Sequence, residues 1–450
     1  MNIKELFLSI SLLFVFVGCA ETIGGYSGVL NQYDAIYDNQ ICDDKFVEEK
    51  IKSKSDLIMW YELGASHMRN CFDYNKSNYY LDQAENLYQS DVDLENQAFK
   101  ATKAVTSVIL NDNIDSYRGN VYETIMLNVY KGLNFMSIGD FKNARVEFNR
   151  ALDRQRRAKD SFRKEIDRRV SELKNKDQDI TKIALNPTSV KTVTNLYDSG
   201  IFANFKAYPD FVNPFATYIS ALFFMADKDY KKARYLLKEN IAMEPNNQVF
   251  KDDFALVNAL LKNPNLKKKY IWLIYENGKS ARKNEMRVDV PLFVVSENVP
   301  YIGMVFPNLQ EQSSSYPFLK IQNQKTNYVA DMDRVIKTEF KTKLPFIITR
   351  SLIRTTIKTV ATYSATKEDE LLGFGLTLFS AFTNRADIRG WVSLPKNFQV
   401  LRVENDGSTL TITSPDDKVI TSISTPKDKN MIVYINSPVM GVDSVHKILF

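Results

Sequence analysis

The spacing of hydrophobic positions changes along the chain and divides it into two halves. Up to about residue 264 they recur every three to four residues, which predicts amphipathic helices. After Asn263-Pro264 they alternate with polar residues in short runs bounded by Gly, Pro, Asn or Asp, which predicts strands and turns. We therefore expect a helical domain over residues 40–264 and a β-rich domain over residues 265–450.

Three segments of the helical half repeat one order of small and bulky positions. Small residues let two helices approach, and bulky residues fill the space between them. The spacing is that of tetratricopeptide repeats, which are pairs of packed helices. The positions that carry the pattern are Gly132, Phe135, Ala144, Phe148 and Ala151 in the clearest copy, Ala221, Tyr230, Ala233 and Pro245 in the second, and Trp60, Gly64 and Ala84 in a third copy that extra residues interrupt.

The stretch between the first two of these copies predicts a long charged helix from Val146 to Lys176. Its Arg and Lys residues interleave with Asp and Glu, which is typical of a solvated face with ion pairs one turn apart. A surface that docks a partner or an anionic lipid is the alternative. A narrow apolar stripe suggests that this helix projects beyond the repeats. The segment from Leu185 to Pro214 holds several prolines and aromatics, and we expect an irregular crossing there.

The second half predicts a sheet with inserted helices. Tyr270–Glu276 is a strand before an Asn277-Gly278 turn, and Arg287–Pro291 can pair with it. Further strands are predicted at Tyr301–Phe306, Tyr316–Ile321, Phe398–Val403, Thr409–Thr413, Val419–Ile423 and Met431–Asn436. A helical insertion covers about 332–383 and is interrupted or kinked at Leu344-Pro345. The expected fold class is α+β, with a TPR-like α-helical repeat domain followed by a β-sandwich-like domain.

The most apolar run after the amino terminus lies within the helical insertion, from Leu371 to Phe382. It is too short to cross a bilayer as a helix, which needs about 20 residues, and the acidic stretch Glu368–Glu370 precedes it. A buried core helix, or a helix that a partner covers, is favoured over a membrane hairpin.

The amino terminus resembles the signal peptide of a bacterial lipoprotein. Lys4 precedes a short apolar run from Leu6 to Val17, which is typical of a secretory signal. The sequence Phe-Val-Gly-Cys that ends at Cys19 resembles a lipobox, so we expect cleavage after residue 18 and lipid on the Cys19 thiol. Ala20 favours sorting to the periplasmic face of the outer membrane. Residues 19–39 are then a lipidated tether. An ordinary signal peptide with an incidental cysteine is the alternative.

Cys42 and Cys71 are the remaining cysteines of the chain. An oxidising periplasm permits a disulfide between them, which would contribute about 3–4 kcal/mol for a loop of this length. Two buried free thiols are the alternative.

Catalytic motifs are missing from the sequence. The net charge of +5 is small for 450 residues and does not call for nucleic acid. His67 and His446 are the two histidines, too few for a zinc site at known spacing, and Ser364-Ala-Thr-Lys367 lacks the companion motifs of a serine acyl-enzyme. We expect no catalytic residue, no metal, no cofactor and no enzyme, although paired carboxylates of a cell-wall-active enzyme stay an alternative.

Four parts of the chain carry a resemblance to known proteins, namely Asn213–Tyr218, Tyr270–Pro291, Leu344-Pro345 with Arg350–Arg354, and above all Ala386–Pro395. Together they resemble a family of uncharacterised bacterial tetratricopeptide-type periplasmic lipoproteins. Members lie in genomes beside lipoproteins similar to activators of penicillin-binding proteins, and similar proteins of polar-flagellated bacteria are candidates for disks or rings around the flagellar motor. The resemblance brings no catalytic residues with it.

Within the last of these stretches, Asp387, Arg389 and Trp391 invite two interpretations. Asp387 and Arg389 can form a charge-assisted bracket and Trp391 can cap the core beside it, or the three can bind a ligand. A buried and paired Arg389 would favour the structural interpretation.

These observations favour a membrane-anchored periplasmic scaffold with protein partners in the periplasm or outer membrane. The repeat groove and sheet edges are the expected docking surfaces. A homo-oligomer stays open. The alternatives are a disk or ring component of a polar flagellar motor and a regulator of peptidoglycan synthesis.

Overall fold

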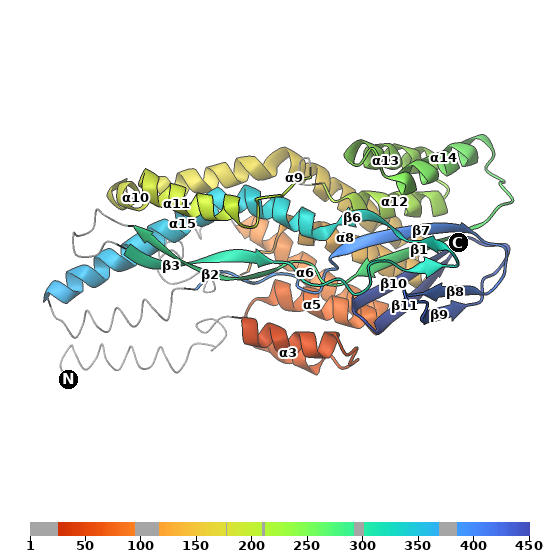
Figure 1. Cartoon of the computed structure of the whole chain (residues 1–450), viewed down its shortest axis with the longest axis horizontal. Coiled ribbons are helices and arrows are strands. Elements are labelled where there is room, and N and C mark those ends of the chain that lie inside the picture. Colours follow the sequence, from red (N-terminus) through yellow and green to blue (C-terminus); the bar gives the residue numbers. More distant parts are fainter. Residues whose placement is uncertain (1–25, 95–116, 177, 209–211, 292–300, 369–384) are drawn as a thin grey trace.

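Paired helices and three sheets make up this computed structural model, which describes residues 26–94, 117–176, 178–208, 212–291, 301–368 and 385–450 (Figure 1). The helices of the first half are α3 (Ser27–Tyr37), α4 (Lys45–Lys52), α5 (Leu57–Asn70), α6 (Tyr74–Leu94), α8 (Val121–Ser137), α9 (Phe141–Lys176), α10 (Gln178–Ala184), α11 (Pro187–Ser199), α12 (Pro214–Ala226), α13 (Tyr230–Met243) and α14 (Gln248–Lys262). The fold class is α+β.

Three helical hairpins, α5–α6, α8–α9 and α12–α13, lie side by side, with α6 against α8 and α9 against α12. Their turns are alike. Each has one residue with positive φ, namely Phe72, Gly139 or Lys228, followed by an aspartate that caps the next helix. The backbone N–H of each aspartate also donates to the carbonyl five residues earlier, on Met68, Phe135 or Phe224. This closes the helix end in the manner of a Schellman turn.

The shared turn corrects the alignment of the first hairpin. Ala84 stands as far beyond its aspartate as Ala151 does in the second hairpin, so no extra residues interrupt this copy. The position equivalent to Gly132 is Ala65, one residue beyond the expected Gly64. Both glycines are still tight contacts, since a Cβ on Gly64 would lie 2.9 Å from Val47 and a Cβ on Gly132 would lie 2.8 Å from Phe148.

The strands of the second half form three sheets. They are β1 (Tyr270–Asn277), β2 (Arg282–Pro291), β3 (Tyr301–Gln310), β4 (Lys320–Ile321), β5 (Gln324–Lys325), β6 (Asn327–Asp331), β7 (Asn397–Glu404), β8 (Leu410–Thr413), β9 (Val419–Ile423), β10 (Met431–Val439) and β11 (Val442–Leu449), with the helix α15 (Met332–Glu368) between β6 and β7. The sheet orders are β11-β10-β1-β7-β6, β2-β3 and β5-β4-β8-β9.

The central strand β1 is covered on both faces of its sheet. Ile271, Leu273 and Tyr275 pack toward the four-stranded sheet in one apolar cluster. Trp272 and Ile274, on the opposite face, belong to a larger cluster that also contains residues of the helical hairpins. The two halves therefore share one continuous core, although the change from helices to strands does fall between Lys262 and Tyr270.

Several expectations about local structure were wrong. The tether expected over residues 19–39 contains the helix α3, and the crossing expected from Leu185 contains α11, whose first turn starts at Pro187 with Asn186 as its cap. Proline suits the first turn of a helix, because its missing N–H has no partner there. Of the strand expected at Tyr316–Ile321, only the last two residues form a strand, which is β4. The strand β11 was not among the expected strands.

Two further expectations about the second half also need correction. Strand β2 pairs with β3 and not with β1, because β7 and β10 occupy both edges of β1. The helix α15 continues through Pro345, so the interruption expected there is wrong. The apolar run 371–382 and the expected end of the helical insertion near 383 lie outside the described residues. Across the ranges that are described, no helix is long and apolar enough to cross a bilayer.

Candidate functional site

The first helices of the three hairpins are buried on nearly all sides, because the chain's own second half covers them. Almost every side chain of α5, α8 and α12 is buried. Phe215 on α12 stacks on Phe398 of β7, with 3.5 Å between ring centroids. A groove between repeats was the expected docking surface, and this face is instead filled from within the molecule.

Trp391 is one of the residues of the second half that cover the first helices of the hairpins. Its indole N–H donates to the Ser66 hydroxyl of α5 at 2.7 Å, and its backbone N–H donates to a carboxylate oxygen of Glu123 on α8 at 3.0 Å. Its ring meets Tyr130 edge-on, with centroids 5.6 Å apart. The side chain therefore ties the loop before β7 to two hairpins at once, and it caps the core as the structural interpretation requires.

Arg389 is buried and paired, with 1% of its surface exposed. Its guanidinium donates to both carboxylate oxygens of Asp387, at 2.8 and 3.0 Å, and to Asp56 at the start of α5. Burial alone would raise the pKa of Asp387, but the guanidinium outweighs burial and holds that pKa at about 2. The bracket expected between Asp387 and Arg389 thus extends to a third residue, Asp56, far away in the sequence.

A second buried arginine joins the halves at another point. The Arg69 guanidinium lies between the rings of Tyr130 and Tyr434, 4.8 and 4.6 Å from their centroids. It also lies 3.4 Å from the carboxylate of Glu276 on β1, and the Tyr434 hydroxyl donates to the same carboxylate. Nothing local in the sequence marks Arg69 and Glu276 as partners, because they are 207 residues apart.

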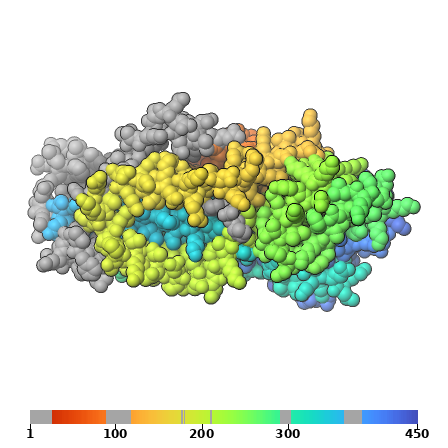
Figure 2. Space-filling view, turned by 90° about the horizontal axis from the view of Figure 1, so that it is seen from above, coloured from red at the N-terminus to blue at the C-terminus, as the bar shows by residue number. Residues whose placement is uncertain are grey.

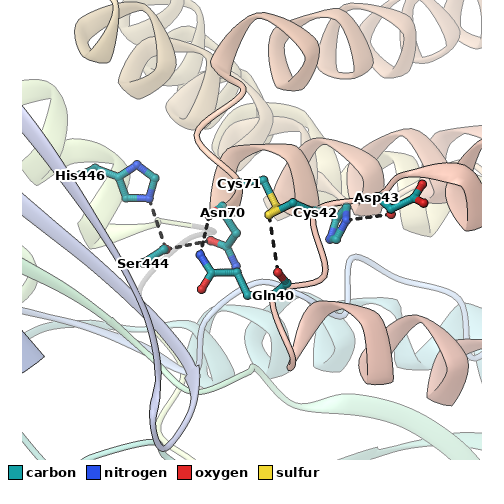
Figure 3. The surroundings of a disulfide bond; sticks show 8 residues. Gln40, Cys42, Asp43, Asn70, Cys71, Ser444 and His446 are labelled. Carbon is teal, nitrogen blue, oxygen red and sulfur yellow. Dashed lines mark hydrogen bonds between the residues drawn. A yellow bond between two sulfur atoms is a disulfide. The ribbon is translucent and has the colours of Figure 1, made fainter.

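Cys42 and Cys71, left open as a disulfide or as two thiols, are bonded in the structure, with Cα atoms 5.5 Å apart (Figure 3). The bond lies beside polar contacts between helices and sheet. Asn70 accepts hydrogen bonds from Asn436 at 2.6 Å and from Ser444 at 3.2 Å, and its carbonyl accepts one from Gln40 at 2.9 Å. The disulfide therefore anchors the loop after α3 next to the sheet edge.

The two histidines lie close to this disulfide and have structural partners. His67 Nε2 is 3.2 Å from the carbonyl oxygen of Asp43, and His446 Nδ1 is 2.7 Å from the Tyr74 hydroxyl. Burial lowers the pKa of His67. Burial, with the Arg69 guanidinium, lowers the pKa of His446 well below its usual value. In the described parts of the chain, no three His, Cys, Asp or Glu residues are arranged to hold a metal ion.

A pair of buried acids lies where α8 begins. Burial, and then the nearby Glu123, raise the pKa of Glu62 well above its usual value. Glu123 accepts hydrogen bonds from Tyr117 and from the backbone of Asn120, closing a capping box. Acidic residues with a strongly shifted pKa mark candidate active sites. The cavity nearby, lined by Val121 and Glu339 among others, measures about 10 Å³ and has room for one water molecule at most.

The repeat positions lie mainly inside the helical hairpins. Buried are Trp60, Gly64, Ala84, Gly132, Ala144, Phe148, Ala151, Ala221 and Ala233. Phe135 and Tyr230 are half-buried, and Pro245 is exposed just beyond α13. Cys19, the expected lipid site, lies outside the described residues.

The outward face of α9 carries ion pairs along the helix. Asp153 contacts Arg156 and Arg157 at 2.5 and 2.9 Å, and Glu165 contacts Arg168 and Arg169 at 2.6 and 2.8 Å. The helix does not project freely, because α8, α12 and α15 pack against it. Figure 2 shows α15 lying between α9 and the segment formed by α10 and α11. The face carries the ion pairs one turn apart that were expected, whereas its alternative role as a docking surface stays a prediction.

The comparisons with known proteins add no relative to this picture. No protein family, curated protein or solved structure matches the chain.

Proposed function

We propose that the protein is a lipid-anchored periplasmic scaffold that holds partner proteins in a cell-envelope assembly. The observation that carries the proposal is that buried ion pairs connect distant parts of the chain. Arg389 with Asp387 and Asp56, and Arg69 with Glu276, join elements of the body to one another. Buried ion pairs of this kind hold the two halves in a fixed arrangement. A body whose outer surfaces are fixed in this way suits a scaffold.

The disulfide supports a place outside the cytoplasm. Structural disulfides persist in oxidising compartments such as the periplasm. The Cys42–Cys71 bond closes a loop within the first described helices, and the secretory pattern before Cys19 points to the same compartment. Lipid at Cys19 would then keep the body at a membrane, which we propose to be the outer membrane.

The three similar hairpins support a tetratricopeptide-like array. Such arrays hold partners on continuous helical surfaces. Because the chain's second half covers α5, α8 and α12, we place the docking surface on the exposed sides of the second helices, chiefly α9 and α13. These sides carry solvated charges such as Arg156 and Arg157, 74% and 68% exposed.

Affinity purification of the full chain from native membranes after cross-linking tests the proposal. We expect protein partners to be recovered with the unmodified chain and to be depleted with Arg156→Glu/Arg157→Glu. Lys251→Glu, an exposed lysine on α14 outside this surface, is the matched control. Recovery of no protein by the unmodified chain would refute the scaffold, and failure of Cys19 to incorporate labelled palmitate would refute the anchor.

A further inference from the structure

Helix α3 is bound to the body along its length. Leu30, Tyr33 and Tyr37 are fully buried or nearly so. The Tyr33 hydroxyl donates to the carbonyl of Leu63 on α5 at 2.9 Å, and the Tyr37 hydroxyl accepts from the side chain of Asn436 on β10 at 3.2 Å. One helix therefore contacts both halves of the molecule.

Ion pairs fix the same helix to the β-rich half. Lys279 contacts Asp38 at 2.6 Å and Asp34 at 3.2 Å, and Arg282 contacts Asp34 at 2.7 Å. These side chains are at most 22% exposed, so solvent screens them little. Tyr26, just before α3, is itself fully buried. The described part of the body thus starts with a buried residue, Tyr26.

The docking of α3 shortens the connection to the proposed anchor. Residues 19–25 remain between Cys19 and the body, and this stretch reaches at most about 25 Å even when fully extended. A free tether over residues 19–39 would reach about 70 Å. Tyr26 must therefore stay within a short distance of the bilayer to which Cys19 is attached.

The position of α3 then decides which side faces the bilayer. Figure 1 shows α3 along one edge of the elongated molecule, between the two ends of its long axis, with α9 along the opposite edge. A body standing on one end would lift the start of α3 away from the membrane. The outward side of α3 is also uncharged, with Ser27, Asn31, Gln32 and Ala35 exposed, because Asp34 and Asp38 are turned to the body.

We propose that the α3 edge is the surface that faces the phospholipid bilayer and that the α9 edge faces away from it. This inference rests on the proposed lipid anchor at Cys19. It assigns the two sides of the scaffold different partners. Lipid headgroups lie against α3, and soluble proteins of the periplasm have access to the exposed side of α9.

Energy transfer from single labels to the bilayer tests this orientation. A fluorescent donor is attached to Gln32→Cys on α3 or to Arg156→Cys on α9, both exposed positions. The introduced cysteine is the one reactive thiol, because Cys42 and Cys71 are bonded and Cys19 is lipidated in the proposal. The full lipidated chain is placed in vesicles of phosphatidylethanolamine and phosphatidylglycerol with an acceptor on the headgroups.

We expect a greater loss of donor fluorescence at position 32 than at position 156. A flexible Gly/Ser insertion of about 20 residues between residues 25 and 26 should reduce the difference, because the greatest reach of the connection then grows from about 25 to about 95 Å. Equal or reversed losses in a chain that floats with the vesicles overturn the orientation alone. A chain that does not float with the vesicles overturns the proposed anchor, and the orientation with it.

Discussion

Replacing Arg389 by methionine tests whether the buried bracket holds the two halves together. Methionine keeps much of the volume of the side chain and removes its charge. Asp387 and Asp56 then lose their shared partner, and Asp56, whose side chain is 3% exposed, is left as a buried acid. Removing one partner of a buried ion pair costs about 3–5 kcal/mol. We expect Arg389→Met to lower the free energy of unfolding by that amount at pH 7.

The pH dependence of the effect follows from Asp387. Its pKa in the folded chain is about 2, below the ordinary value of 3.8. A carboxyl with a depressed pKa stabilises the fold fully above the ordinary value and loses this contribution as pH falls through the folded pKa. The shift corresponds to about 2 kcal/mol. The cost of Arg389→Met should therefore shrink between about pH 4 and pH 2 through Asp387. It should begin to shrink above pH 4 through Asp56, because burial raises the pKa of Asp56 even beside Arg389.

Urea unfolding followed by the fluorescence of the three tryptophans measures this difference. Arg156→Met is the matched control, because Arg156 is 74% exposed and its loss should change stability by less than about 0.5 kcal/mol. The reasoning about the bracket is refuted if Arg389→Met costs no more than the control, or if its cost is the same at pH 3 as at pH 7.

Three further predictions concern the turns, the disulfide and a buried histidine. Lys228 has a φ of 61° in the third hairpin turn, at the position that Gly139 occupies in the second. Lys228→Gly should therefore stabilise the chain and Gly139→Ala should destabilise it, each by about 1 kcal/mol in urea unfolding. Changes of the opposite sign would contradict the shared turn. The Cys42→Ser/Cys71→Ser variant should lose about 3 kcal/mol, and reductant should then have no further effect on its unfolding midpoint. Burial and Arg69 lower the pKa of His446, so its contribution is present above the ordinary pKa of about 6.5 and is lost as pH falls below it. His446→Gln should flatten the loss of stability below that pH, and an unchanged slope would exclude this histidine as its source.

The short-range features of the fold could be predicted from the sequence. Helical spacing located α9 and the helices of the repeats, and alternation located β1, β7 and β10. Each of these patterns depends on residues within a few turns or strand positions of one another. Helix α3 could have been found the same way, because Tyr26, Leu30, Tyr33 and Tyr37 recur at helical spacing.

Contacts between the halves could not be predicted in this way. Asp56, Ser66 and Glu276 are 333, 325 and 207 residues away in the chain from Arg389, Trp391 and Arg69, which they contact. Their side chains look like those of any surface arginine or core tryptophan until both halves are packed. The sequence identified Arg389 as a residue to examine, and only the tertiary structure supplied Asp56.

The sequence by itself determined the α+β class, the change from helices to strands near residue 264 and the order of small and bulky positions in the paired helices. Only the tertiary structure decided that the second half fills the face between the hairpins and that α3 is bound to the body. The physical reason is the separation along the chain between the residues that interact. Local backbone preferences depend on neighbours along the chain, whereas the burial of a helix face depends on which distant surface covers it.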